Sequence, residues 1–211
     1  MIFCFCFMTI GLYNKKMTLQ NKQRDGLIWA AAKLFRRQGY SGTGLRDILA
    51  ASGAARGSLY HYFPNGKEEI GAAAVTAAGG LVTETFAELA RQSDSPADFL
   101  HRYTELLVRW LEASKFRDGC PITTTLLETT PASRPITVAG QAVFADWLAV
   151  LAAMLARHGW PADRGAATAT AIIAGLEGAL MLARVQGSAQ PIHDTAQALC
   201  ILLEMPEKES L

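Results

Sequence analysis

Residues 43–64 have the sequence TGLRDILAASGAARGSLYHYFP, which reads as two short helices joined by a tight turn. Thr43 has a side chain suited to cap the start of the first helix. Gly53 supplies the backbone freedom that a tight turn needs. The second helix is expected from about Ala55 to Tyr62, because the residue before Pro64 is pushed out of the helical region. The stretch therefore predicts two helices set at an angle.

A longer helix is expected just before this stretch, over residues 21–38. Its apolar side chains recur at steps of three and four, which places them on one helical face. These positions are Leu27, Ile28, Ala31, Leu34 and Phe35. Gly39 follows, where a left-handed residue typically ends a helix. Three helices in this order predict a helix-turn-helix module, whose last helix enters the major groove of DNA.

The last helix of this module carries the side chains that DNA recognition needs. Long or hydrogen-bonding groups are expected on its outer face, and Gly57 would let the backbone approach DNA closely. These groups belong to Arg56, Ser58, Tyr60, His61 and Tyr62. Leu59 and Phe63, four residues apart, should pack inward. The alternative for Tyr60 and Tyr62 is a half-buried position with only the hydroxyl in water.

Charge is distributed unevenly along the chain. Residues 15–67 hold ten of the twenty Lys and Arg but only two of the nineteen acids, a net charge of +8. Residues 68–211 carry −7, and the whole chain of 211 residues carries +1. This favours a polyanion-binding module attached to a second unit. The alternative is a helical surface that happens to be basic.

The sequence here resembles the TetR family of bacterial transcriptional regulators. The match rests on Gly-Ser-Leu-Tyr-His-Tyr-Phe at residues 57–63, followed by Lys-Glu-Glu at 67–69. The FPNGKEE ending, Gly119-Cys120-Pro121 and Glu128 are similar to the LmrA/YxaF branch of that family. Ala54 and Ala55 depart from the family pattern, and Ala55 lacks a hydroxyl that would contact phosphate. The resemblance implies that DNA is contacted by Thr43, Arg46, Arg56, Ser58, Tyr60, His61 and Lys67, with Tyr62 as a packing or phosphate-side residue.

Beyond residue 67 the sequence again reads as helices. They are expected over residues 67–92, 96–114, 121–128, 134–158, 162–185 and 192–204, with a possible bend at Gly79-Gly80. The fold class is therefore all-α. We expect residues 1–17 to be an extra arm or a mis-called start, 18–66 the helix-turn-helix domain, and 67–206 a helical domain for effector binding and dimerisation.

The last two expected helices could associate with a second chain. The helix over 162–185 is rich in Ala and Gly, which allows close packing, and the final helix repeats apolar residues. Two such helices from each of two chains could form a four-helix bundle, although packing within one chain is the alternative. The resemblance favours a homodimer, which would read two half-sites of a pseudo-palindromic operator.

The middle helices could enclose a small, mostly hydrophobic effector, as the resemblance implies. Apolar walls with a few polar groups suit such a ligand, although aromatic side chains at helical spacing are more often core. The candidate lining residues are Tyr103, Trp110, Thr124, Glu128, Trp147, Met154 and Glu177.

Together these features predict a ligand-responsive DNA-binding regulator, a cytoplasmic repressor that releases its operator when an effector binds. The rival hypothesis is a ligand-binding or thiol-based sensor with little sequence-specific DNA binding. In it, the start of the following helix would lower the pKa of Cys120 and make its thiol reactive.

Enzyme and membrane functions are not favoured by the sequence. The four histidines are dispersed without metal-ligand spacing, and no phosphate-binding loop or nucleophile elbow is present. We therefore expect no catalytic residue, metal or cofactor. No uninterrupted apolar run approaches the ~18–20 residues of a membrane span. The apolar segment at residues 1–8 is short, and no cleavage site follows it.

Overall fold

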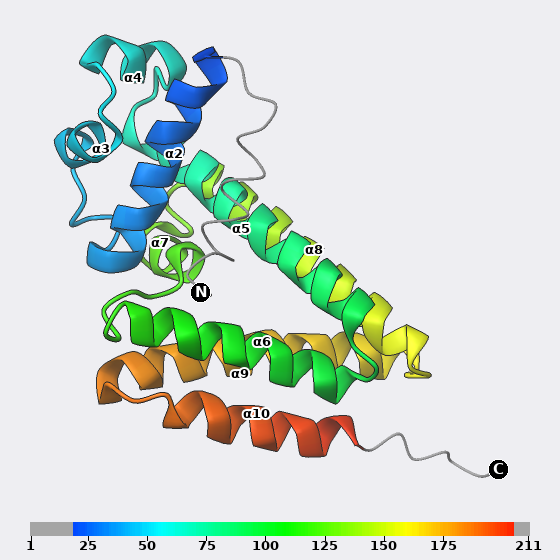
Figure 1. Cartoon of the computed structure of the whole chain (residues 1–211). Helices are drawn as coiled ribbons and strands as arrows, with labels where there is room; N and C mark the ends of the chain where they lie inside the picture. The colour runs from blue at the N-terminus through cyan, green and yellow to red at the C-terminus, as the bar shows by residue number, and fades with distance from the viewer. Residues whose placement is uncertain (1–18, 205–211) are drawn as a thin grey trace.

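The computed structural model describes residues 19–204, and every regular element in that range is an α-helix (Figure 1). The side chains of residues 19–21 are not described, and the predicted N-terminal arm, residues 1–17, lies outside the described range. The helices are α2 (Leu19–Gln38), α3 (Leu45–Ser52), α4 (Arg56–Tyr62), α5 (Lys67–Gln92), α6 (Pro96–Ala113), α7 (Pro121–Thr129), α8 (Arg134–Arg157), α9 (Ala162–Gln186) and α10 (Gln190–Leu203). The all-α prediction is confirmed.

The first three of these helices share a hydrophobic core. Phe35 of α2, Ile48 of α3 and Leu59 of α4 are fully buried in one cluster, which Ile70 of α5 completes. Gly53 adopts a left-handed conformation at φ 68° between α3 and α4, as the turn required. The helix-turn-helix arrangement is thus built by local turn residues and closed by apolar packing.

The start of α3 differs from the prediction at Thr43. Gly44 is the N-cap, and its amide donates to the Asp47 carboxylate, 2.7 Å away. The hydroxyl of Thr43 instead donates to the Gly39 carbonyl at 2.8 Å, and the side chain is fully buried. Asp47, at the third position of the helix, thus accepts from the N-cap amide as in a capping box, whereas Gly44 has no side chain to accept a hydrogen bond in return. Thr43 therefore stabilises the turn before α3 from inside.

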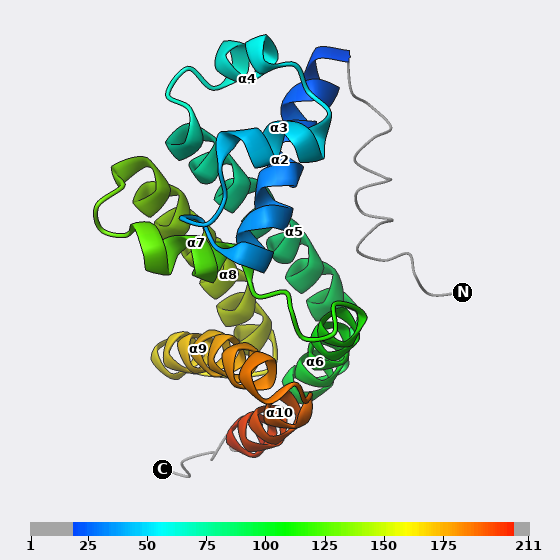
Figure 2. The same ribbon diagram turned by 90° about the vertical axis from the view of Figure 1, so that its left-hand side faces the viewer.

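The remaining helices enclose a second, larger core. α5 and α8 lie side by side, and the Trp147 indole of α8 donates to the Gly79 carbonyl of α5 at 3.0 Å. α5 continues through Gly79 and Gly80 as a single element. Both ribbon views place α3 and α4 at one end of the molecule and α9 and α10 at the other (Figures 1 and 2). A conformational change at one end can therefore reach the other end through α5 or through the helices that contact α2.

Three helices are long and apolar enough to cross a membrane by length and composition, namely α5, α8 and α9. The sequence prediction considered only uninterrupted apolar runs and therefore missed them. In this fold the three helices pack side by side, with α8 between α5 and α9.

Candidate nucleic-acid interface and effector site

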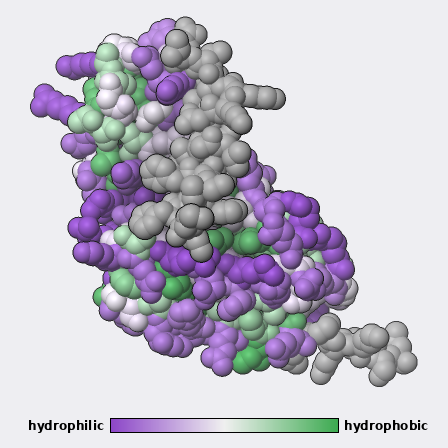
Figure 3. Space-filling view, in the orientation of Figure 1, coloured by the Kyte–Doolittle hydropathy of each residue, from purple (hydrophilic) through white to green (hydrophobic). Residues whose placement is uncertain are grey.

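The outer face of α4 presents most of the predicted DNA-contacting groups to solvent. Arg56, Gly57 and His61 are exposed, and Tyr60 is 46% exposed, while Leu59 and Phe63 are buried on the opposite face. Arg46 of α3 is also exposed. In the space-filling view, hydrophilic side chains project from the end of the molecule that holds α3 and α4 (Figure 3). One helix face is thus available for a groove of DNA.

Ser58, Tyr62 and Lys67 are only partly exposed. The Tyr62 ring packs edge-on against His61, with centroids 4.9 Å apart. The Lys67 ammonium lies 4.3 Å from the centroid of the Tyr40 ring. Burial lowers the pKa of Lys67, and the negative charges of Glu128 and Asp47 oppose this shift. Lys67 thus packs against Tyr40 at the base of the helix-turn-helix module.

Thr43 does not lie on the exposed surface. Its side chain is fully buried and its hydroxyl is already used by Gly39, so a direct side-chain contact with DNA would require the turn to open. The family resemblance alone could not separate a residue that contacts DNA from one that shapes the turn.

Two of the predicted effector residues meet at a polar cluster between α6, α7 and α9. The Thr123 hydroxyl donates to the Glu177 carboxylate at 2.8 Å. Tyr103 and Cys120 are the other members, and all four side chains are partly buried. Burial raises the pKa of the Glu177 carboxyl, although hydrogen bonds with Cys120 and Thr123 oppose the shift. This cluster combines a desolvated acid with neutral hydrogen-bonding groups, which can orient a mostly apolar ligand.

Aromatic side chains surround one side of this cluster. The Tyr103 ring packs edge-on against Phe86 at a centroid distance of 4.7 Å, and Phe86 in turn contacts Trp147 at 5.9 Å. Trp147 and Met154 are 2% and 1% exposed, so both are core residues in this structure. A ligand could contact Trp147 or Met154 only if the core opened.

The other predicted effector residues lie near α2. The Arg36 guanidinium lies 5.5 Å from the centroid of the Trp110 ring, and Thr124 is partly exposed on α7. Glu128, at the end of α7, points to the helix-turn-helix module, where it accepts hydrogen bonds from the amides of Tyr40 and Ser41. Glu128 is therefore a junction residue between α7 and the loop after α2.

The environment of Cys120 is opposite to that of a reactive thiol. The residue is the N-cap of α7, which favours a thiolate, but burial raises its pKa and the negative charge of Glu177 raises it further. A thiol held neutral in this way is a poor nucleophile. The structure thus gives no support to the thiol-sensor hypothesis.

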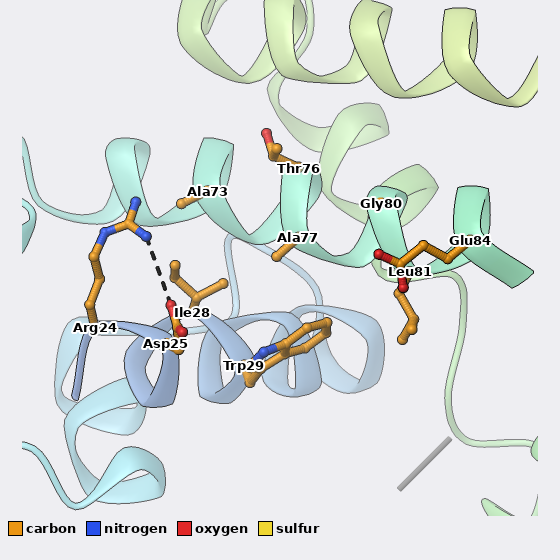
Figure 4. A pocket seen from close by; sticks show the side chains of 10 residues that line it. All are labelled: Arg24, Asp25, Ile28, Trp29, Ala73, Thr76, Ala77, Gly80, Leu81 and Glu84. Carbon is orange, nitrogen blue, oxygen red and sulfur yellow. Dashed lines mark ion pairs between the residues drawn. The ribbon is translucent and has the colours of Figure 1, made fainter. Parts of the chain in front are cut away.

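A hollow of about 410 Å³ lies elsewhere, between α2 and α5 (Figure 4). Arg24 and Asp25 lie at one end of it and Glu84 at the other, with Ile28 and Trp29 of α2 between them. None of the seven residues predicted to bind the effector lines it.

Exposed apolar side chains gather on α9 and α10. Each of them is at least 43% exposed, which is unusual for five large apolar groups on neighbouring helices. They are Met181, Leu182, Val185, Ile201 and Leu202. The space-filling view shows apolar atoms reaching the surface over α10 (Figure 3). This surface is suited to contact with another apolar surface.

Sequence reasoning missed the residues that join α2 to the second core. Arg36 Nε lies 3.1 Å from an Asp118 carboxylate oxygen, and the Gly119 amide donates to the Arg36 carbonyl at 2.8 Å. Thr123 was also missed as the partner of Glu177. The opposite charges of Arg36 and Asp118 were a weak signal for an ion pair. No local sequence pattern, however, links two residues more than 80 positions apart.

Comparison with known proteins identifies both parts of the chain. Residues 27–74 match the family model for bacterial regulatory proteins of the tetR family. Residues 96–198 match the model for the C-terminal domain of LmrA/YxaF-like transcriptional regulators. The chain is 31% identical to the uncharacterized HTH-type regulator YxaF of Bacillus subtilis, over 89% of this chain and 98% of that protein. It is 28% identical to the regulator LmrA of the same organism, over 86% and 96%.

Solved structures show the same architecture. A TetR regulatory protein from Rhodobacter sphaeroides is 27% identical with a TM-score of 0.71, covering 84% of this chain and 96% of that one. A TetR regulator from Legionella pneumophila, 17% identical, shares the fold with a TM-score of 0.77 over 90% and 99%.

Proposed function

The chain belongs to the TetR family of bacterial transcriptional regulators, and we propose that it is a repressor released from DNA by a small, mostly hydrophobic effector. In this proposal a homodimer binds a pseudo-palindromic operator in the cytoplasm. The helix-turn-helix domain comprises residues 18–66, and residues 67–206 bind the effector and the second chain.

The exposed face of α4 is the observation that carries the DNA-binding part of the proposal. Arg56, Tyr60 and His61 extend from a helix that is anchored by buried Leu59. Arginine can form two hydrogen bonds to guanine in the major groove, and tyrosine can donate to phosphate. The net charge of +8 over residues 15–67 adds attraction to the DNA backbone.

The apolar surface of α9 and α10 supports dimerisation. Two copies of this surface would bury Val185 and Ile201, which are 81% and 60% exposed in a single chain. A two-fold dimer presents two copies of α4, and each would occupy one half-site.

The cluster around Glu177 is the proposed polar part of the effector site. A ligand there would compete with Thr123 for the carboxylate and contact Tyr103. We propose that the ligand displaces α5, which starts at Lys67 beside the helix-turn-helix module and runs into the effector domain. A shift of α5 changes the separation of the two α4 helices, so that they no longer match successive major grooves.

DNA from the gene's own upstream region provides the direct test. We expect the purified protein to form a site-specific complex whose affinity falls steeply as salt is raised from 50 to 200 mM, since each phosphate contact releases counterions. Arg56→Ala should weaken the specific complex by about tenfold or more, the size of one lost contact to a base.

Arg109→Ala is the matched control, because Arg109 is an exposed arginine on α6, outside the helix-turn-helix domain. It should leave the affinity within about twofold. Equal affinity for operator and unrelated DNA, or equal losses in the two variants, would overturn the proposed function.

A further inference from the structure

The loop after α2 is held by a side chain from a distant part of the sequence. Glu128 at the end of α7 accepts a hydrogen bond from the Tyr40 amide at 2.8 Å and one from the Ser41 amide at 2.7 Å. These partners lie 88 and 87 residues away in the sequence. Each carboxylate oxygen takes one amide, so both oxygens are used.

The backbone of the loop is shaped to receive this carboxylate. Gly39 has φ 84°, and a Cβ atom at this residue would lie 2.5 Å from Glu128 Oε1. A side chain there would therefore displace the carboxylate. Two consecutive amides that point at one carboxylate form a favourable anion site, and their hydrogen bonds to a charged acceptor are stronger than those to a neutral one.

The charges around Glu128 keep it ionised. Burial alone would raise the pKa of its carboxyl, but hydrogen bonds from Ser41 and Tyr40 and the nearby Lys67 ammonium together hold the pKa below its usual value. Lys67 in turn lies against the Tyr40 ring. Tyr40, in the loop after α2, is thus contacted both by Glu128 of α7 and by Lys67 at the start of α5.

The other end of α7 also meets α2. Just before α7, the Gly119 amide donates to the Arg36 carbonyl at 2.8 Å, and Asp118 pairs with the Arg36 guanidinium at 3.1 Å. Within α7, Thr123 binds Glu177. The nine residues of α7 therefore connect the loop after α2 with the proposed effector cluster.

We infer that Glu128 is a positioning residue for DNA binding, whose carboxylate latches the α2–α3 loop to α7 and so fixes the orientation of the helix-turn-helix module on the effector domain. This inference rests on the proposed function. A dimer needs both modules in a fixed orientation to occupy two half-sites at once, whereas one module can bind a single half-site in any orientation. The latch therefore matters for the full operator and not for the half-site.

The test compares Glu128→Ala with the wild type on two DNA duplexes, the full operator and one half-site. Loss of the latch should weaken binding to the full operator by about tenfold and change half-site binding by less than about twofold. Glu128→Gln keeps one acceptor oxygen, so its loss should be smaller. Glu112→Ala, which removes an exposed acid from α6, should match the wild type on both duplexes.

Hydrogen exchange gives an independent readout of the latch itself. The amides of Tyr40 and Ser41 should exchange at least tenfold faster in Glu128→Ala, while the Leu59 amide in α4 keeps its wild-type rate.

The outcomes separate this inference from the function on which it rests. If the wild type does not prefer the operator, the proposed function fails. If the wild type binds the operator and Glu128→Ala binds it equally well, or loses affinity equally for operator and half-site, Glu128 does not position the module. A variant that melts early and loses protection throughout α2–α4 would likewise overturn a positioning role in favour of a purely structural one.

Discussion

Thr43 and Arg56 show how similar sequence signals lead to different roles at the scale of single residues. Both belong to the stretch that resembles TetR-family proteins, yet Thr43 is fully buried and Arg56 is exposed. The hydroxyl of Thr43 satisfies the Gly39 carbonyl at the end of α2. A helix end leaves such carbonyls without intrahelical partners, so this hydrogen bond stabilises the turn.

Thr43→Val keeps the shape of the side chain and removes its hydroxyl. The Gly39 carbonyl then loses a buried partner, which should destabilise the protein by about 1–3 kcal/mol. We expect a lower midpoint of urea unfolding and an unchanged operator affinity under folding conditions. A loss of affinity without a loss of stability would show that Thr43 contacts DNA after all.

Glu177 should make the stability of the protein depend on pH. Its folded pKa is raised, so the folded state binds its proton more tightly than the unfolded state does. Stability is therefore lost as pH rises from the ordinary glutamate pKa, about 4.3, through the folded value. Glu177→Gln avoids this loss, and its amide oxygen can still accept from Thr123.

We thus expect Glu177→Gln to unfold at a temperature roughly 2 °C or more above the wild type at pH 7.5. The difference should shrink toward pH 4.5, as thermal unfolding by circular dichroism can show. Glu105→Gln on α6 serves as a comparison. A gain of the same size at both pH values would mean that ionisation of Glu177 is not its cause.

At the scale of elements, local sequence signals were sufficient to predict where the helices lie, but insufficient to predict which side chains form contacts between them. Gly53, Pro64 and Pro96 are sequence-local features, and the helices they bound lie where they were expected. The role of Glu128 depends on amides 87 and 88 residues away, which no local pattern encodes. The rival hypothesis of a reactive Cys120 rested on a local signal in the same way, because a helix start favours its thiolate whereas burial and the distant Glu177 raise its pKa.

The proposed pairing of α9 and α10 with a second chain gives the prediction at this scale. Val185→Glu places a charge on the proposed dimer surface, and burial of an unpaired charge opposes association. Sedimentation equilibrium should change from roughly twice the chain mass of 22.7 kDa toward the monomer mass, with loss of operator binding. Val138→Glu, at an exposed apolar position on α8, should remain dimeric. A dimer that survives Val185→Glu would place the interface elsewhere.

At the scale of the whole molecule, two cores are joined along α2, α5 and α7. The helices that carry most of the predicted DNA-contacting residues, α3 and α4, lie at one end, and the proposed dimer surface on α9 and α10 lies at the other (Figure 1). In the proposed dimer, a change at the proposed effector site would alter the spacing of the two α4 helices through small rotations at the junction. The uneven charge of the sequence predicted a basic module attached to a second unit, whereas the side chains at the junction became visible only in the structure.

Hydroxyl-radical footprinting of the upstream DNA tests the central claim most directly. A two-fold dimer that reads DNA through α4 should protect two symmetric patches, separated centre to centre by one helical turn of about 10 base pairs or a multiple of it. Both patches should disappear together in Arg56→Ala and remain in Arg109→Ala. A single asymmetric patch, or protection that survives Arg56→Ala, would contradict a dimeric regulator that recognises its operator through this helix.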